Sequence, residues 1–307
     1  MKNALDSAFF NRDLCRSVTN PVIAAPNWRF GARALARFGK EVIMNAYLYA
    51  AGRRMAAGLE GRFEILSGIA ARYVEVLAIV FLWKWAYRKR ESLYGMNEEQ
   101  MSAWMILAAG LTVFYSMQVH LKIRDEIKRG GLGFLYPCSL PGMYLAEDLG
   151  RAVIGLPIRC IPVVLLGGLT FGLIPPAGEK ELLLAACFAA GGWLMVWIMY
   201  AIVGTASCWL MELGELGVAL AVLIAFLSGS MLPLEFFPQP VREALFRLPF
   251  RYAFQTPLSL YLGRITLEEG IWELGAMLVW ILLLLCMLKL VWESARKKQQ
   301  GDRGFGG

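Results

Sequence analysis

Three long stretches of this sequence carry no charged side chain. Cys160–Ala177, Leu182–Met211 and Leu216–Leu234 contain no Asp, Glu, Lys or Arg. A helix needs about 20 apolar residues, with a range of roughly 17–25, to cross the hydrocarbon core of a bilayer. A chain in lipid must satisfy its backbone hydrogen bonds internally, so apolar segments of this length form helices. The sequence therefore predicts an all-α, polytopic membrane protein.

The composition favours a membrane protein over a soluble one. Of the 307 residues, 58% are hydrophobic and 18% are charged, whereas a soluble domain carries roughly 25% charged residues. The net charge of +7 is explained by basic residues that flank membrane helices and meet anionic lipid. We therefore expect membrane lipid as a partner and no binding of nucleic acid.

Hydropathy divides the chain into a cytoplasmic lead (residues 1–31), a membrane domain (32–292) and a basic cytoplasmic tail (293–307). From Ala32 onward, apolar side chains recur at spacings of three and four, which predicts a basic amphipathic helix in the membrane interface. A surface helix packed on protein is the alternative. The six expected spans are residues 65–85, 102–121, 152–173, 182–210, 218–232 and 271–291.

The distribution of Lys and Arg predicts the orientation. With a cytoplasmic N-terminus, eighteen of these residues fall on the cytoplasmic side and nine on the other. Cytoplasmic loops carry an excess of basic residues, so this asymmetry favours cytoplasmic N- and C-termini. The basic residues between Lys84 and Arg90 are the exception, because they fall on the outer side.

Residues 122–148 form a charged segment after the second span. The segment begins with a helical pattern, which the glycine pair at 130–131 ends. A charged helix that projects from two membrane helices into the cytoplasm would suit docking of a partner protein. A solvated loop without a partner is the alternative. The candidate docking residues are Arg124, Asp125, Glu126 and Lys128.

Residues 233–269 are too rich in proline for one continuous span and too apolar for an ordinary external loop. Between the prolines, Val241–Leu248 and Ala253–Leu262 are expected to form short helices. Irregular backbone at membrane depth occurs only where protein or a water-filled cavity covers it. Two re-entrant helices fit this pattern, and two interfacial helices lying flat are the alternative. The candidate pathway residues are Pro233, Pro238, Pro249, Phe250 and Arg251.

Charged residues also lie within or beside the expected spans. Arg72 and Glu75 are three residues apart, close enough to pair on one helix face. Charges inside a membrane are unfavourable and usually face the bundle interior or a pathway, which makes Arg159 a candidate as well. Arg151, near the membrane boundary, can instead extend its head group to the interface. For Arg72 and Glu75, a structural pair and a substrate site are both open.

Motifs for catalysis or metal binding are missing from the sequence. The six cysteines form no CxxC or CxxH pair, and the single histidine, His120, excludes a multi-histidine metal site. There is no GxxxxGK[ST] phosphate loop, and there is no HExxH or GxSxG motif. We therefore expect no catalytic residue, no metal site and no cofactor in this chain.

Two of these segments together resemble ABC-2 type exporter permeases. Ile127–Leu132 and Leu135–Pro141 resemble the first cytoplasmic loop of that family. Leu227–Pro238 resembles the end of its fifth span, and Leu248–Tyr252 and Tyr261–Arg264 continue the likeness. The order of these motifs, and their spacing relative to the six spans, is similar to short bacterial permeases that have no fused ATPase.

The resemblance implies a permease subunit of an ATP-driven exporter in the bacterial inner membrane. Two permease subunits, as a homodimer or with a related partner, would lie above a dimer of cytoplasmic ATPase subunits that bind ATP and Mg²⁺. The amphipathic helix and the charged loop would contact the ATPase, and the short helices before the last span would shape the outer end of the pathway. An ATP-independent channel or secondary carrier is one alternative, and a scaffold without transport is another. The weakly charged spans favour an amphipathic cargo.

Overall fold

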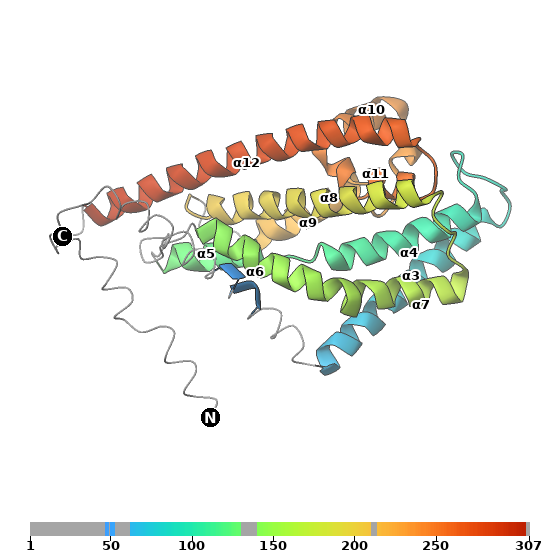
Figure 1. Cartoon of the computed structure of the whole chain (residues 1–307), viewed down its shortest axis with the longest axis horizontal. Coiled ribbons are helices and arrows are strands. Elements are labelled where there is room, and N and C mark those ends of the chain that lie inside the picture. Colours follow the sequence, from blue (N-terminus) through green and yellow to red (C-terminus); the bar gives the residue numbers. More distant parts are fainter. Residues whose placement is uncertain (1–46, 49, 53–61, 130–139, 210–213, 305–307) are drawn as a thin grey trace, which may run out of the picture. The chain divides into compact units, whose positions relative to one another are not determined.

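The computed structural model describes residues 47–48, 50–52, 62–129, 140–209 and 214–304 (Figure 1). They belong to one of the two units into which the chain divides, Ala46–Gly307, and the other unit, Met1–Asn45, lies outside them. The predicted lead, nearly all of the predicted amphipathic helix and the glycine pair at 130–131 also lie outside the described residues. These expectations stay predictions.

Every regular element in the described ranges is helical, which confirms the all-α class. Long α-helices alternate with short ones, and one π-helical and two 3-10 segments interrupt them. The elements are α3 (Arg62–Tyr87), α4 (Glu98–Phe114), α5 (Val119–Lys128), α6 (Leu140–Gly155), the π-helix η1 (Leu156–Cys160), α7 (Ile161–Phe171), α8 (Glu179–Ala206), α9 (Gly214–Leu227), η2 (Leu234–Phe236), α10 (Gln239–Arg247), η3 (Pro249–Tyr252), α11 (Gln255–Tyr261) and α12 (Leu267–Gly304).

The described residues contain five helical stretches that are long and apolar enough to cross a membrane. The predicted fifth span, residues 218–232, corresponds instead to α9, whose apolar part Leu216–Leu227 is shorter than about 20 residues. α9 ends before Gly229, which has a φ of 87° that a helix cannot accommodate. The count of six spans therefore stays a prediction. The five stretches are Phe63–Tyr87, Glu98–Lys128, Leu140–Phe171, Glu179–Ala206 and Leu267–Gln299.

The predicted second span, residues 102–121, is not one regular helix. α4 ends at Phe114, and the link 115–118 separates it from α5. The Tyr115 hydroxyl in this link donates a hydrogen bond to the Ala253 carbonyl at 2.7 Å. The helix therefore ends where a side chain anchors the chain to a segment far away in the sequence.

The third membrane helix begins earlier than the predicted span at 152–173. α6 starts at Leu140, so residues 140–148, predicted to be a loop, are helical. Pro141 occupies the first turn, where its missing N–H interrupts no helical bond. Pro157 lies within η1, and its ring likewise cannot donate the hydrogen bond that an α-helix needs.

The last helix extends into the predicted tail, as far as Gly304. The sequence predicts a span at 271–291 followed by a separate tail, whereas α12 continues unbroken from Leu267 to Gly304. The side chain of Gln299 donates to the Ile127 carbonyl at 3.0 Å, which holds this part of the helix against α5. Lys, Arg and Gln are good helix formers, so a helix that starts in the membrane continues into a polar sequence.

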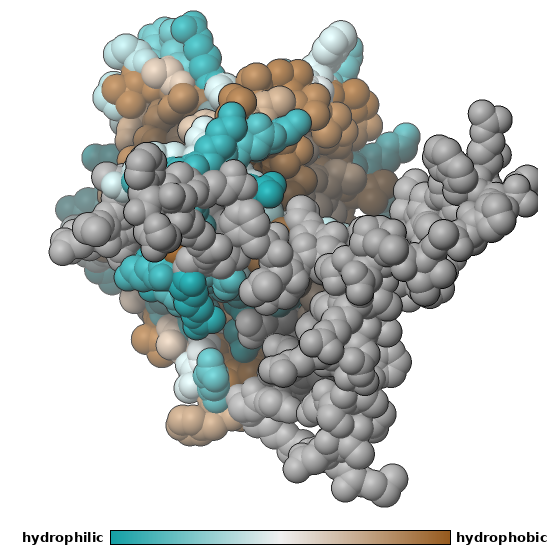
Figure 2. Space-filling model, turned by 90° about the vertical axis from the view of Figure 1, so that its left-hand side faces the viewer, coloured by the Kyte–Doolittle hydropathy of each residue, from teal (hydrophilic) through white to brown (hydrophobic). Residues whose placement is uncertain are grey.

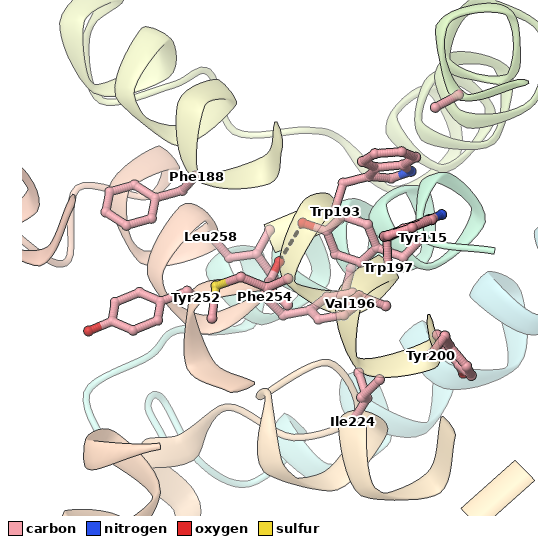
Figure 3. Close-up of a cluster of buried hydrophobic side chains, with 14 of the residues drawn as sticks. Tyr115, Phe188, Trp193, Val196, Trp197, Tyr200, Ile224, Tyr252, Phe254 and Leu258 are labelled. Atoms are coloured by element: carbon pink, nitrogen blue, oxygen red, sulfur yellow. Dashed lines mark hydrogen bonds between the residues drawn. The ribbon is translucent and has the colours of Figure 1, made fainter. Parts of the chain in front are cut away.

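α8 is the helix around which much of the described part packs. α5, α9, α11 and α12 contact α8, while α3, α4 and α7 pack against one another (Figure 1). Around α8, the aromatic rings of Tyr115 and Phe254 meet at 5.0 Å beside the buried Leu258 (Figure 3). By contrast, in the most apolar stretches of α3 and α12 only 11% and 17% of the residues are buried. Outward-facing apolar side chains on long helices are suited to contact with lipid.

Two sets of hydrogen bonds define two ends of this helix bundle. At the first, which we call the α5 end, α12 side chains donate to the carbonyls of Ile127 and Cys208 at 3.0 and 2.9 Å. At the other, which we call the α10 end, the Ala177 N–H donates to the Tyr261 carbonyl at 2.9 Å. Figure 2 looks onto the α5 end, where hydrophilic side chains gather between hydrophobic flanks.

Candidate functional site

α5 is a short amphipathic helix that packs on α8. Val119 and Ile123 on its inner side are fully buried. The His120 ring stacks on Tyr200 of α8, with ring centroids 5.0 Å apart. Gly204 allows this close approach, because a Cβ there would lie 2.7 Å from the Cα of His120. The inner face of α5 is therefore fixed, and its charged face remains available.

A buried ionic network links α5 to two membrane helices. The Lys122 ammonium donates to Asp148 Oδ1 at 2.8 Å and to Glu147 Oε2 at 3.1 Å. Trp197 Nε1 of α8 donates to the other Asp148 oxygen at 3.1 Å. Asp148 is 4% exposed, so both of its oxygens need donors to offset the loss of water. Lys122 therefore links the position of α5 to α6 and to α8.

The four predicted docking residues lie on α5, but the structure does not gather them into one cluster. Arg124 donates to its neighbour Asp125 at 3.1 Å. Asp125 and Lys128 are exposed, and Glu126 is half-buried. Sequence reasoning missed Lys122, whose partners lie 25 and 26 residues further along the chain. The signal that could have found it is a lysine directly beside the apolar position 123.

The predicted pair on the first membrane helix is present. Arg72 Nη1 and Glu75 Oε2 lie 2.7 Å apart on α3, and their side chains are 39% and 63% exposed. The pair therefore lies on a face of α3 that the other described helices leave open. The structure does not bring this pair into contact with Arg159, which lies on η1 and lines a cavity instead.

That cavity has a volume of about 280 Å³ and lies between α3, α6, η1, α8 and the link before α5. Its wall carries the charged side chains of Glu64, Asp148, Arg151 and Arg159, together with the indole of Trp193. Asp148 also belongs to the Lys122 network. The Asp148 carboxylate therefore belongs both to the wall of the cavity and to the ionic network that holds α5.

The proline-rich segment folds into two short α-helices and two 3-10 turns. Pro233 is buried directly before η2, and Pro249 is buried as the first residue of η3. Pro238 is exposed and precedes α10. Each proline stands where its missing N–H interrupts no helical hydrogen bond. α10 and α11 match the predicted short helices to within a few residues.

Arg251 connects this segment to the last helix. Its guanidinium donates to Glu273 of α12 and, at 3.0 Å, to the Tyr252 hydroxyl. The Tyr252 hydroxyl donates to the same Glu273 oxygen at 3.0 Å. Phe250 packs partly buried against the hydrophobic core. Both predicted residues therefore hold the segment against its neighbours.

Gln255 is the centre of the α10 end, and sequence reasoning missed it. Its Oε1 accepts from the Leu234 N–H at 2.9 Å, and its Nε2 donates to the Glu235 carboxylate at 2.9 Å. Its backbone N–H donates to the Ser228 carbonyl at 2.9 Å. Gln255 is 2% exposed, so it holds together the end of α9, η2 and α11. The adjacent polar side chains Gln255 and Thr256 at the start of a buried helix are the signal that could have found it.

The segment before α12 reaches far along α8 and then turns back. A Cβ on Gly192 would lie 2.8 Å from the Cα of Ala253, so Ala253 touches α8 there. At 1.5 Å per residue, Gly192 is about 20 Å from the start of α8. Beyond α11, Tyr261 bonds to Ile174 and Ala177 in the loop before α8. α11 therefore runs from the middle of α8 back to the α10 end.

α8 connects the two regions. It carries Trp197, which bonds to the Lys122 network, and Gly192, which touches Ala253. α8 therefore contacts both the Lys122 network and the start of the segment that leads into α11. The described residues contain no group of three or more His, Cys, Asp or Glu side chains placed to hold a metal ion.

Long apolar helices that leave wide apolar faces open define a multi-pass membrane protein. Residues 73–302, most of the chain, match the family described as ABC-2 family transporter protein. The chain therefore belongs to the ABC-2 family of transporter proteins, which confirms the resemblance seen in the sequence. This membership indicates a permease component of an ABC transporter rather than an enzyme. Comparisons with curated proteins and with solved structures gave no match.

Proposed function

We propose that this chain is the permease subunit of an exporter driven by ATP hydrolysis in separate ATPase subunits. The observation that carries this function is α5, a charged helix that Lys122 links to both α6 and α8. A partner that moves the exposed face of α5 would move two membrane helices with it. Membership of the ABC-2 family supplies the general partnership with an ABC ATPase.

We place the α5 end in the cytoplasm of a bacterial cell and the α10 end outside its inner membrane. The basic C-terminal part of α12 bonds at the α5 end, and basic segments favour the cytoplasmic side. Both chain termini would then be cytoplasmic. The basic loop after α3 is on the disfavoured side in this orientation, but Lys84 lies 3.5 Å from Glu98, which offsets part of its charge.

The assembly would contain two permease subunits and two ATPase subunits. The second permease is a copy of this chain or a related one, and the ATPase dimer binds the ATP and Mg²⁺. The open apolar faces of α3 and α12 offer surface for a second subunit as well as for lipid. The Arg72–Glu75 pair lies on this face of α3, where a second subunit would shield it from water and strengthen it.

The outer end of the pathway would be formed by the segment between α9 and α12. The contact of Ala253 with Gly192, about 20 Å along α8, supports re-entrant helices over helices lying flat in the interface. Residues 252–260 are all buried, as irregular backbone at membrane depth requires. Closure of the ATPases would displace α5, tilt α8 and shift this segment, which would release an amphipathic cargo to the outside.

The test is reconstitution with the ATPase encoded beside this gene. The two proteins should copurify, and the permease in vesicles should stimulate ATP hydrolysis. The double reversal Asp125→Lys and Glu126→Lys should abolish this stimulation. The matched control, Glu91→Lys and Glu268→Lys, reverses two exposed charges outside α5 and should leave it unchanged. Stimulation that survives the reversal on α5 would contradict its coupling role.

The Arg72–Glu75 pair favours a second candidate, an ATP-independent channel or secondary carrier, because the pair lies exposed on a membrane helix. Such a protein would transport cargo into vesicles without nucleotide, and Arg72→Gln would abolish the flux. A scaffold would copurify with partners and transport nothing under either condition. Nucleotide-dependent transport that tolerates Arg72→Gln would support the exporter against both.

A further inference from the structure

The cavity between α3, α6, η1 and α8 has two arginines on its wall without an anionic partner among the described residues. Arg151 and Arg159 both line the cavity and both are half-buried. Neither forms an ion pair or a side-chain hydrogen bond within the described ranges. A guanidinium held partly out of water without an anion is unfavourable. Two such groups facing one cavity therefore indicate a ligand.

The π-helical turn brings the two arginines to the same side of the helix. In a regular α-helix, residues eight apart would lie about 80° away from each other around the axis, at ~100° per residue. η1 begins between them and contains Arg159, and the Ile161 N–H that follows η1 bonds to the Leu156 carbonyl five residues back. The extra residue in this turn reduces the offset, so Arg159 faces the cavity that Arg151 faces. π-helical turns of this kind occur frequently at functional sites.

The two unpaired guanidinium groups on the wall favour an anion whose oxygens can accept from both of them. Asp148 is already engaged, because one oxygen accepts from Lys122 and the other from Trp197. Glu64, in the exposed first turn of α3, is the other acid on the wall. Lys122 is shared with Glu147, the neighbour of Asp148 on α6, so the two unpaired guanidinium groups, and not a net charge, favour an anion. A phosphodiester carries one negative charge, and its oxygens match the forked donors of arginine.

The outer surface beside the cavity is apolar. Leu149, Val153 and Leu156 on α6 and η1 are 51%, 56% and 43% exposed. A cavity of about 280 Å³ has room for a polar head group but not for acyl chains, which would lie along this apolar surface. Basic pockets between membrane helices on the cytoplasmic side are known to bind lipid head groups.

We propose that this cavity binds the head group of an anionic glycerophospholipid of the phosphatidylglycerol class. The phosphodiester lies between Arg151 and Arg159, and the glycerol hydroxyls donate to Glu64. The acyl chains follow the exposed apolar side chains of α6 and α7. Such a site requires only that the chain lies in a bilayer, so it is independent of whether the protein is an exporter.

The test is native mass spectrometry of the full-length chain released from detergent micelles. The chain is titrated with phosphatidylglycerol or phosphatidylcholine, which share the phosphodiester, although the choline group adds a positive charge beside the arginines. We expect phosphatidylglycerol to bind at least about tenfold more tightly. Arg151→Gln with Arg159→Gln should remove this preference. The control Lys289→Gln with Arg296→Gln removes two exposed charges of α12 and should keep it.

Three results would overturn the lipid site. Equal binding of the two lipids by the wild type is the first, and a preference that survives the double glutamine variant is the second. Complete displacement of phosphatidylglycerol by inorganic phosphate would be the third, because it would show a site for a soluble anion. If the glutamine variant does not fold, Arg151→Lys with Arg159→Lys keeps the charges but loses the forked donors. Wild-type affinity in that variant would exclude bidentate binding.

Discussion

The two ends of this protein are held together in different ways. At the α5 end, Lys122 forms ion pairs with Glu147 and Asp148 of α6, and Asp148 also accepts from Trp197 of α8. At the α10 end, Gln255 joins three elements through its side-chain amide and its backbone N–H, and Arg251 adds an ion pair with Glu273. The lysine has three rotatable donors on a flexible stem, whereas the amide and the backbone fix direction as well as distance. Because the directional bonds of Gln255 add to the ion pair there, we expect the α10 end to keep its shape more firmly than the α5 end.

The largest effect is expected at Asp148, where the charged network is most buried. Asp148→Ala leaves the Trp197 N–H without its acceptor and Lys122 without its nearest carboxylate, so we expect the free energy of unfolding to fall by about 3 kcal/mol. Urea or thermal unfolding in detergent micelles measures the change. Asp148→Asn keeps an acceptor for Trp197 and should lose less. A loss for Asp148→Ala below about 0.5 kcal/mol, typical of surface sites, would show that α5 is held by other contacts.

Gln255→Leu should have the next largest effect, at the opposite end. It removes the acceptor of the Leu234 N–H and the donor to Glu235 in a buried site, and a buried unsatisfied group costs about 1–3 kcal/mol. We expect a loss of about 2 kcal/mol, measured by the same unfolding experiments. Gln239→Leu on exposed α10 breaks a 3.1 Å bond to Glu243 and should cost almost nothing. Similar losses in both variants would mean that Gln255 has no special role.

The positions of the long helices could be predicted from the sequence better than the residues at which they begin and end. α3, α8 and α12 lie where the long apolar runs predict them, because in lipid such a run satisfies its backbone hydrogen bonds by forming a helix. The ends of helices were harder to predict. α6 starts at Leu140 and α12 continues to Gly304, since a polar sequence extends a helix readily once the helix has started. Hydropathy marks where lipid begins rather than where a helix ends.

For the candidate site, separation along the chain decided what could be predicted. Arg72 and Glu75 are three residues apart, so the helical repeat alone predicts their pair. Asp148 lies 26 residues from Lys122 and 49 from Trp197. No local pattern joins such residues, because packing of α5 and α6 on α8 brings them together. The same holds for the contact between Gln255 and Glu235, which are 20 residues apart.

Two glycines with positive φ provide a smaller and more selective test of the α10 end. Gly229 and Gly172 have φ angles of 87° and 81°, so alanine is strained at both by about 1 kcal/mol. A Cβ at Gly229 would lie 2.7 Å from Gln255 Oε1, whereas a Cβ at Gly172 meets nothing within 4 Å. We expect Gly229→Ala to lower the free energy of unfolding further, by about 1 kcal/mol more. Equal losses would show that the Gln255 amide shifts freely.

The smallest effect on stability is expected on the exposed face of α5. The Arg124 and Asp125 side chains are 24% and 51% exposed, so Asp125→Ala should cost less than about 0.5 kcal/mol. It should nevertheless reduce stimulation of the partner ATPase, because this face would meet that subunit. Glu243→Ala breaks the exposed hydrogen bond to Gln239 on α10 and should leave both unfolding and ATP hydrolysis nearly unchanged. An equal loss of stimulation in both variants would show that α5 has no special contact with the ATPase. A loss of stimulation confined to Asp125→Ala would show that the two sides of α5 have different roles. The inner side at Lys122 would contribute to stability, and the outer side would contribute to coupling with the ATPase.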